Sequence, residues 1–239
     1  MRHIFAHHLF LIQESPTSSG QSIWPEFWGG FTGAFFAFLF GIISYLLIKR
    51  YERFILHRDA IVKLERALND ALDVTSLNLV QAAGTVAVLR QSRLTHNRLI
   101  KFELPPDVSL EIGSIALVNE YQAYERLINR INYDFAAVNY TLTRLEDMMI
   151  GGNPVAPQNF TLMIDALNRF PRVLNNLDAK TKRLLCIIRI YLAKLKRVNR
   201  FWFAVSNKDW DMPVTEAEIA AEMAMLEAEI ERVVRESTP

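Results

Sequence analysis

The chain has 239 residues, of which 51% are hydrophobic and 22% are charged, and its formal net charge is +1. Because the charge is nearly neutral, nothing in the composition predicts attraction to nucleic acid, and no nucleic-acid partner is expected. The single cysteine excludes a disulfide within the chain and a cysteine-rich zinc site. That residue, Cys186, lies in the apolar run LLCII and is predicted to be a buried core residue.

Residues 1–23 are predicted to form an extracytosolic tail and linker. Residues 1–12 have a basic start and an apolar run, but histidines interrupt the run and no small-residue cleavage site follows, which disfavours a secretory signal. His3 and His7 have i, i+4 spacing, yet the segment offers too few further ligands for a metal site. Residues 13–23 contain Ser, Gly, Pro and Gln and favour a flexible linker.

Residues 24–48 are predicted to form a transmembrane helix. The run 27–48 carries no charge, and at about 1.5 Å per residue it covers roughly 33 Å, close to the thickness of the hydrocarbon core. The alternative is a buried helix in a soluble core. Aromatic residues at both ends of the run are typical of membrane interfaces: Trp24, Trp28, Tyr45 and Tyr51.

Charge predicts the orientation of this helix. Only Arg2, Glu14 and Glu26 are charged before the run, whereas a basic series follows it: Lys49, Arg50, Arg53, Arg58, Lys63 and Arg66. We call Lys49, Arg50 and Arg53 the membrane-orientation cluster. Basic residues that flank a membrane helix are usually on the cytosolic side. The amino terminus is therefore expected outside and residues 49–239 in the cytosol. The expected location is the cell (inner) membrane, with membrane lipid as a partner.

A stripe of small residues recurs every four positions in the predicted span. We call Gly29, Gly33, Ala37 and Gly41 the helix-association stripe. Such a stripe allows two membrane helices to approach closely, which favours self-association. The alternative is that glycine is simply frequent in membrane helices.

The helix is expected to continue, and residues 49–103 are predicted to form a long membrane-proximal helix. The segment 49–83 is rich in helix-favouring residues, and Ile61, Leu64, Leu68 and Leu72 form an apolar stripe. The pattern blurs over 77–89, where helix is favoured over a short strand near Gly84. Leu104-Pro105-Pro106 ends the element, and Asp107 or Ser109 is expected to cap the next helix.

Residues 107–205 are predicted to form an antiparallel helical hairpin. Two apolar seams alternate in spacing between four and three: first Leu117, Tyr121, Tyr124, Ile128, Ile131, Phe135, Val138, Leu142, Leu145 and Met149, then Met163, Leu167, Phe170, Leu174, Leu177, Thr181, Leu184, Ile188, Tyr191, Leu195, Val198 and Trp202. The turn 151–154 separates them, and Pro171 predicts either a kink or a short helix followed by a longer one. Further apolar residues beside the seams favour a bundle of three or more helices, with the long helix as the third member.

Residues 214–236 are predicted to form an acidic helix. Thr215 and Glu218 have the spacing of a capping box, and Ile219, Met223, Leu226, Ile230 and Val233 form its apolar stripe. The helix before it is basic. Three interpretations stay open: each charged face is solvated, the acidic helix docks on the basic one in the same or another chain, or the basic face binds anionic lipid or nucleic acid.

The sequence contains no recognised catalytic, cofactor or metal motif, so no enzyme, cofactor or metal site is expected. His57 and His96 are too far apart in sequence to suggest a shared site. No role follows from the sequence for the helical asparagines Asn132, Asn139, Asn168, Asn175 and Asn176.

The predicted fold is therefore all-α, with a single transmembrane helix followed by a cytosolic antiparallel coiled-coil-like helical bundle. The function expected of this architecture is that of a membrane-anchored scaffold or protein-interaction module, with protein partners or a homo-oligomer bound through the helical seams. The alternative is a membrane-coupled signal-relaying or membrane-perturbing effector that switches by helix packing.

Overall fold

The computed structural model describes residues 24–93, 95–106, 108–153 and 155–237, and all regular structure in these ranges is helical. The prediction of an all-α fold is confirmed. The chain divides into two compact units, Met1–Leu46 and Leu47–Pro239. The expected tail and linker at 1–23 and the expected cap at Asp107 lie outside the described residues.

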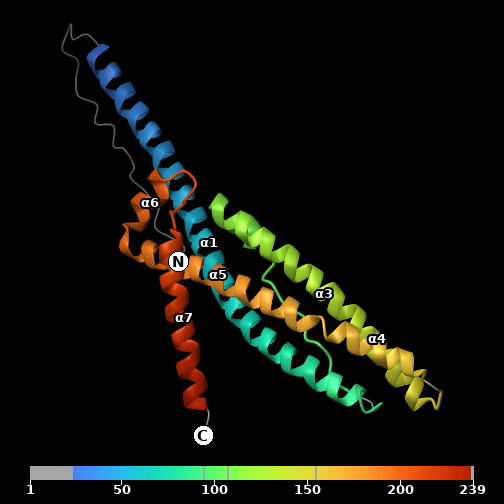
Figure 1. Cartoon of the computed structure of the whole chain (residues 1–239). Helices are drawn as coiled ribbons and strands as arrows, with labels where there is room; N and C mark the ends of the chain where they lie inside the picture. Colours follow the sequence, from blue (N-terminus) through green and yellow to red (C-terminus); the bar gives the residue numbers. More distant parts are fainter. Residues whose placement is uncertain (1–23, 94, 107, 154, 238–239) are drawn as a thin grey trace. The chain divides into compact units, whose positions relative to one another are not determined.

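The helices are numbered in chain order, and Figure 1 labels all of them except α2. They are α1 (Trp24–Leu89), α2 (Val108–Glu111), α3 (Ile115–Ile150), α4 (Pro157–Leu167), α5 (Phe170–Arg197), α6 (Arg200–Ser206) and α7 (Glu216–Ser237). Residues 77–89 are helical, as the sequence favours. The helix does not reach residue 103, however, because α1 ends at Leu89 and residues 95–105 are not helical.

The first unit contributes one apolar helical stretch. Every side chain of α1 from Trp28 to Leu46 is exposed, including the large side chains of Phe38 and Phe40. Within the described residues, α1 is the one helix that is long and apolar enough to cross a membrane. None of this stretch is buried among the described residues, which is unusual for an aromatic-rich helix in water.

In the second unit, α3 and α5 are antiparallel. The Tyr124 hydroxyl lies 3.1 Å from Thr181 Oγ1, and the rings of Phe135 and Phe170 are 5.1 Å apart. The contact that lies later in α3, at Phe135, is with a residue that lies earlier in α5, Phe170, so the two helices run in opposite directions. Thr181 Oγ1 donates to the Leu177 carbonyl, so Tyr124 is the donor to Thr181, and the one polar residue of the second seam is satisfied.

The two seams are buried over most of their length. The first is buried from Leu117 to Leu145, and the second from Met163 to Leu195. Val198 and Trp202 do not belong to the buried seam, because α5 ends at Arg197 and leaves Trp202 64% exposed. Pro171 stands in the first turn of α5, directly after α4, so the chain has a short helix followed by a longer one.

Both α1 and α3 end in a reversal of the Schellman type. After α3, Asn153 N–H donates to the Met148 carbonyl and Gly152, at φ +72°, donates to the Met149 carbonyl. After α1, Ser92 occupies the same left-handed position at φ +51°. The cap of α3 is Ser114, whose hydroxyl accepts from Leu117 N–H, whereas Ser109 lies inside α2.

Helix α7 packs on α5 within the same chain. The predicted capping box is present: Thr215 N–H donates to the Glu218 carboxylate, and Glu218 N–H donates to Thr215 Oγ1. Ile219 and Leu226 are buried, whereas Ile230 and Val233 are exposed, so only the first half of the stripe is covered. Acid–base pairs join the helices: Arg183–Glu216 at 2.6 Å, Lys194–Glu218 at 2.7 Å and Arg189–Glu229 at 3.3 Å.

The segment that replaces the expected end of the long helix is held by asparagine side chains. Each asparagine accepts from the N–H and donates to the carbonyl of one residue. Asn78 of α1 pairs with Ile100 in this way, and on α3 Asn132 pairs with Phe102 and Asn139 with Leu99, all at 2.7–2.9 Å. The side-chain amides therefore satisfy backbone groups that a helix would otherwise satisfy internally.

The spacing of these contacts matches the geometry of the two backbones. Asn132 and Asn139 are one heptad apart, about 10.5 Å along a helix. Phe102 and Leu99 are three residues apart, about 10 Å in an extended chain. One heptad further along α3, Glu146 pairs with Arg98 and His96. The segment thus runs antiparallel to α3 along a polar row with a seven-residue period.

Replacing Asn132 by alanine should destabilise the bundle. Both polar backbone groups of Phe102 would lose their partners in a buried setting, which costs about 1–3 kcal/mol. The free energy of unfolding, measured by denaturant titration of the full chain in mild detergent, should fall by this amount. Asn129→Ala is the matched control, since Asn129 is exposed on the same helix. Equal effects of the two substitutions would contradict the role given to Asn132.

Candidate functional site

The helix-association stripe and the membrane-orientation cluster have different surroundings in the structure. In the helix-association stripe, an added Cβ at Gly29, Gly33 or Gly41 would meet no described atom within 4 Å, so none of the described residues covers this side of α1. In the membrane-orientation cluster, Lys49 and Arg53 are exposed, whereas Arg50 is partly buried in the second unit. The cluster therefore does not act as one uniform surface charge.

Arg50 is bound to the end of α6 and the loop after it. Its Nε donates to the Ala204 carbonyl at 2.8 Å, and its Nη2 donates to the Asn207 carbonyl at 2.7 Å. The guanidinium also lies 6.0 Å from the centre of the Trp210 ring. A cation is favourable at a helix carboxyl terminus, where carbonyl groups lack helical partners. These hydrogen bonds hold the carboxyl end of α6 against α1 at Arg50.

His57 is the centre of the most buried polar network. Its Nδ1 accepts from Gly113 N–H at 2.9 Å, and its Nε2 lies 2.8 Å from the Tyr191 hydroxyl. That hydroxyl donates to the Trp210 carbonyl at 2.6 Å. Because Nδ1 accepts, the neutral imidazole carries its proton on Nε2 and donates it to Tyr191. The network therefore joins α1, the α2–α3 loop, α5 and the Trp210 loop.

Burial keeps this network neutral. His57 has no exposed surface, and desolvation lowers its pKa to about 4, with a smaller opposing effect of the Asp211 carboxylate. The same burial raises the pKa of Tyr191 above its ordinary value. Neither group is set up to exchange protons near neutral pH, so the geometry indicates a structural junction rather than an acid–base pair.

Aromatic rings close the junction around His57. Phe54 lies 5.7 Å and His57 5.2 Å from the Trp210 ring. Trp210 has φ +49°, and its Nε1 donates to the Ala204 carbonyl. A Cβ at Gly113 would lie only 2.3 Å from the Trp210 ring, so the close packing of these two residues requires glycine.

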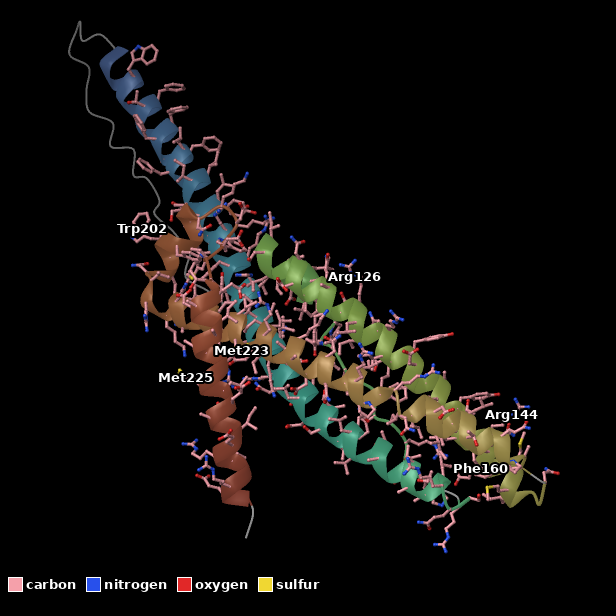
Figure 2. All side chains as sticks on the ribbon, in the orientation of Figure 1. Arg126, Arg144, Phe160, Trp202, Met223 and Met225 are labelled. Atoms are coloured by element: carbon pink, nitrogen blue, oxygen red, sulfur yellow. The ribbon has the colours of Figure 1, made fainter. Side chains whose placement is uncertain are left out.

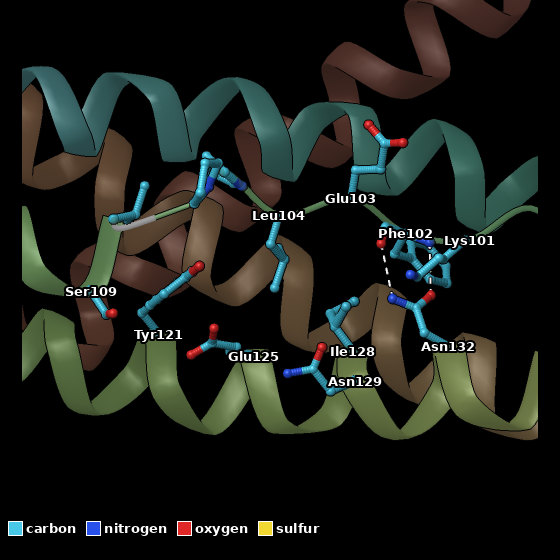
Figure 3. Close-up of a pocket in the computed structure, with 13 residues that line it drawn as sticks. Lys101, Phe102, Glu103, Leu104, Ser109, Tyr121, Glu125, Ile128, Asn129 and Asn132 are labelled. Atoms are coloured by element: carbon cyan, nitrogen blue, oxygen red, sulfur yellow. Dashed lines mark hydrogen bonds between the residues drawn. The ribbon is translucent and has the colours of Figure 1, made fainter.

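A groove of about 420 Å³ lies beside the segment 101–106 (Figure 3). Glu125 and Asn129 of α3 point toward it below Leu104, next to the Asn132–Phe102 pair. Glu125 is one heptad before Asn132, in the polar row that pairs with the segment. The corresponding position in the segment is Pro105, which has no N–H to donate, so the row of backbone pairs ends here.

Other chemistry-bearing residues have structural roles. Cys186 is buried, as predicted, and desolvation raises the pKa of its thiol to about 11. Ser114 caps α3 and donates to Asp211. Among the described residues, no group of three or more histidine, cysteine, aspartate or glutamate side chains is arranged to hold a metal ion.

Sequence reasoning missed His57 and Asn78, although a signal for both exists. The stripe Ile61, Leu64 and Leu68 can be extended in both directions with the same alternating spacing. Backward it reaches His57, and forward it reaches Asn78. Both are buried. Of the asparagines left without a role, Asn132 and Asn139 pair with the non-helical segment.

Comparison of the chain with protein-family descriptions, curated proteins and solved structures finds no match. The role of these residues therefore follows from their geometry and chemistry.

The stability of the bundle should depend on the protonation of His57. A native-state pKa of about 4, below the ordinary 6.5, means that the unfolded chain binds the proton more readily. Stability is fully present above the unfolded pKa and is lost as the pH falls toward 4, by about 2 kcal/mol from roughly pH 7 to pH 5. Chemical unfolding at several pH values measures this. His57→Gln should flatten this part of the profile, and an unchanged profile would contradict the role given to His57.

Gly113→Ala should be strongly destabilising, because the new methyl group overlaps the Trp210 ring and forces it out of the junction. A loss of about 1–3 kcal/mol is expected in the free energy of unfolding. Gly84→Ala is the matched control: its Cβ would meet only Asn97 Nδ2 at 3.8 Å, and alanine is the better helix former by up to about 1 kcal/mol. Opposite signs for the two substitutions are the expected result, and a neutral Gly113→Ala would contradict the packing argument.

Proposed function

We propose that this protein is a single-pass membrane-anchored helical scaffold or interaction module that self-associates through its membrane helix. In this proposal α1 spans the cell (inner) membrane with the amino terminus outside, and a coiled-coil-like bundle lies in the cytosol. Its role is to hold a rigid helical surface at the membrane for protein partners. The chemistry is burial and recognition, without a catalytic or cofactor-dependent step.

The observation that carries the proposal is the exposed apolar stretch of α1. Its side chains from Trp28 to Leu46 are all exposed, and none of them is charged. Water is a poor solvent for such a surface, and hydrocarbon is a good one. The basic residues that follow, Lys49 and Arg53 among them, support the inward orientation of the bundle.

Self-association is supported by the open side of the stripe. Nothing within the described chain lies close to Gly29, Gly33 or Gly41, so a second helix is able to approach the backbone there. In hydrocarbon, close van der Waals contact takes the place of the hydrophobic effect as the driving force.

In this proposal the surface for protein partners is an outer face rather than the helical seams, because α3 and α5 bury their seams within one chain. The outer face of α3 carries residues that are frequent in protein interfaces. Tyr133 is 76% and Tyr140 is 70% exposed. Arg126, Arg130 and Arg144 lie on the same side at heptad-like spacing, and Figure 2 labels the first and last of them. We propose that acidic partner segments bind here.

One observation favours the second candidate, a membrane-coupled relay or membrane-perturbing effector. Helix α1 is a single element from Trp24 to Leu89, so the apolar stretch and the buried junction share one backbone. Growth arrest on overexpression, lost when residues 27–48 are scrambled, would favour this candidate over a passive scaffold.

The proposal is tested by membrane extraction and cross-linking of the full chain. Wild-type protein should remain with the membrane in alkaline carbonate, and it should give a cross-linked dimer or higher oligomer in mild detergent. Gly33→Leu should stay in the membrane but lose most of the cross-linked product, because the larger side chain blocks close approach.

Phe35→Leu is the matched control: position 35 is two residues from both Gly33 and Ala37, so it lies on the opposite face of the helix, where its side chain is exposed. Release of the wild type by carbonate would overturn the membrane anchor. Equal cross-linking of wild type, Gly33→Leu and Phe35→Leu would overturn the stripe alone.

A further inference from the structure

Helix α6 carries an exposed aromatic pair in an unusually basic stretch of the chain. Trp202 is 64% and Phe201 is 38% exposed, and Trp202 projects from α6 away from the rest of the bundle (Figure 2). Lys196, Arg197 and Arg200 precede the pair and are all exposed. Within the described part of the chain, none of these three cations forms an ion pair.

α6 is attached to the residues that directly follow the uncharged run. The Tyr51 ring lies 5.7 Å from Phe201, and the Phe54 ring lies 5.8 Å from Phe203. Arg50 binds the Ala204 carbonyl. Residues 50–54 are two to six positions beyond Ile48, about 3–9 Å along a helix.

This distance corresponds to one lipid headgroup layer. The headgroup regions add about 10–15 Å to a hydrocarbon core of about 30 Å, which is about 5–8 Å on each side. If α1 spans the membrane as proposed, covalent continuity brings residues 50–54, and with them α6, to this layer. Tryptophan and phenylalanine beside lysine and arginine are the side chains that suit it.

The same surface has a groove suited to an anionic group. It measures about 410 Å³, lies between α1 and α5, and its charged lining residues are Arg58, Glu65, Arg189, Lys196 and Arg200. Arg58 is paired with Asp59 and Arg189 with Glu65, whereas Lys196 and Arg200 form no ion pair with the described residues. Anionic headgroups attract such residues, and zwitterionic ones do so far less.

We propose that α6 is a second membrane contact, in which Phe201 and Trp202 insert into the cytosolic headgroup layer and Lys196, Arg197 and Arg200 bind anionic lipid. This inference rests on the proposed membrane anchor. It gives the bundle a defined orientation at the membrane, since one helix alone leaves the rotation and tilt of a domain free, whereas two contacts restrict them.

The test uses spin labels on single cysteines in the full chain, reconstituted in lipid nanodiscs. Trp202→Cys reports the proposed contact, Phe38→Cys reports the span, and Tyr133→Cys reports the outer face of α3. Wild-type protein checks that the buried Cys186 is not labelled. Accessibility to oxygen, which enriches in lipid, is compared with accessibility to a water-soluble nickel chelate.

With phosphatidylserine in the disc, position 202 should show an oxygen-to-nickel ratio between those of 38 and 133. The ratio should move to the value at 133 in pure phosphatidylcholine, or when K196E, R197E and R200E are combined. The far-UV circular dichroism and the thermal unfolding midpoint must be the same with and without these three substitutions, which shows that the bundle is still folded.

Three outcomes would overturn the inference. A water-like signal at 202 with a lipid-like signal at 38 removes the second contact and leaves the anchor intact. Water-like signals at both positions remove the anchor as well. Shielding of 202 from both reagents, independent of lipid and lost when each disc holds one chain, would mean that a second copy covers this surface.

Discussion

The structure depends on burying one side of α1 after residue 49. Positions along this side alternate in spacing between four and three from Arg50 to Leu89, and from Phe54 onward all of them are buried. They are Arg50, Phe54, His57, Ile61, Leu64, Leu68, Ala71, Thr75, Asn78, Ala82, Thr85 and Leu89. Only part of this set is large and apolar. The rest is small or polar because it faces backbone, a loop or a hydrogen-bonding ring rather than another apolar seam.

This composition explains which parts of the fold the sequence predicts. The seams of α3 and α5 pair apolar side chains with each other, and their periodicity, the turn at Gly152 and the capping box at Thr215 are all present in the structure. The same reasoning does not predict where α1 ends. Thr75, Asn78 and Thr85 are buried there, but because they are polar, a search for an apolar stripe predicts that they are exposed.

The segment 95–105 is a second case in which local pattern is insufficient. Its residues have no strong preference against helix before Leu104, yet Leu99, Ile100 and Phe102 are not helical, and their backbone groups bond to distant asparagines. Tertiary contacts overrule propensity here. The network around His57 could not be predicted from the sequence either, because its residues are far apart in the chain and meet only in the folded bundle. They are His57, Gly113, Tyr191 and Trp210. The apolar run 27–48 and the basic residues after it were visible in the sequence because they are consecutive.

The asparagine pairs also couple two helices to each other. The segment 99–102 bonds to Asn78 on one helix and to Asn132 and Asn139 on another. Its polar backbone groups have all their partners only when both helices are in place. Displacement of either helix would leave some of these backbone groups unpaired, so the segment makes the stability of α1 and that of α3 depend on each other.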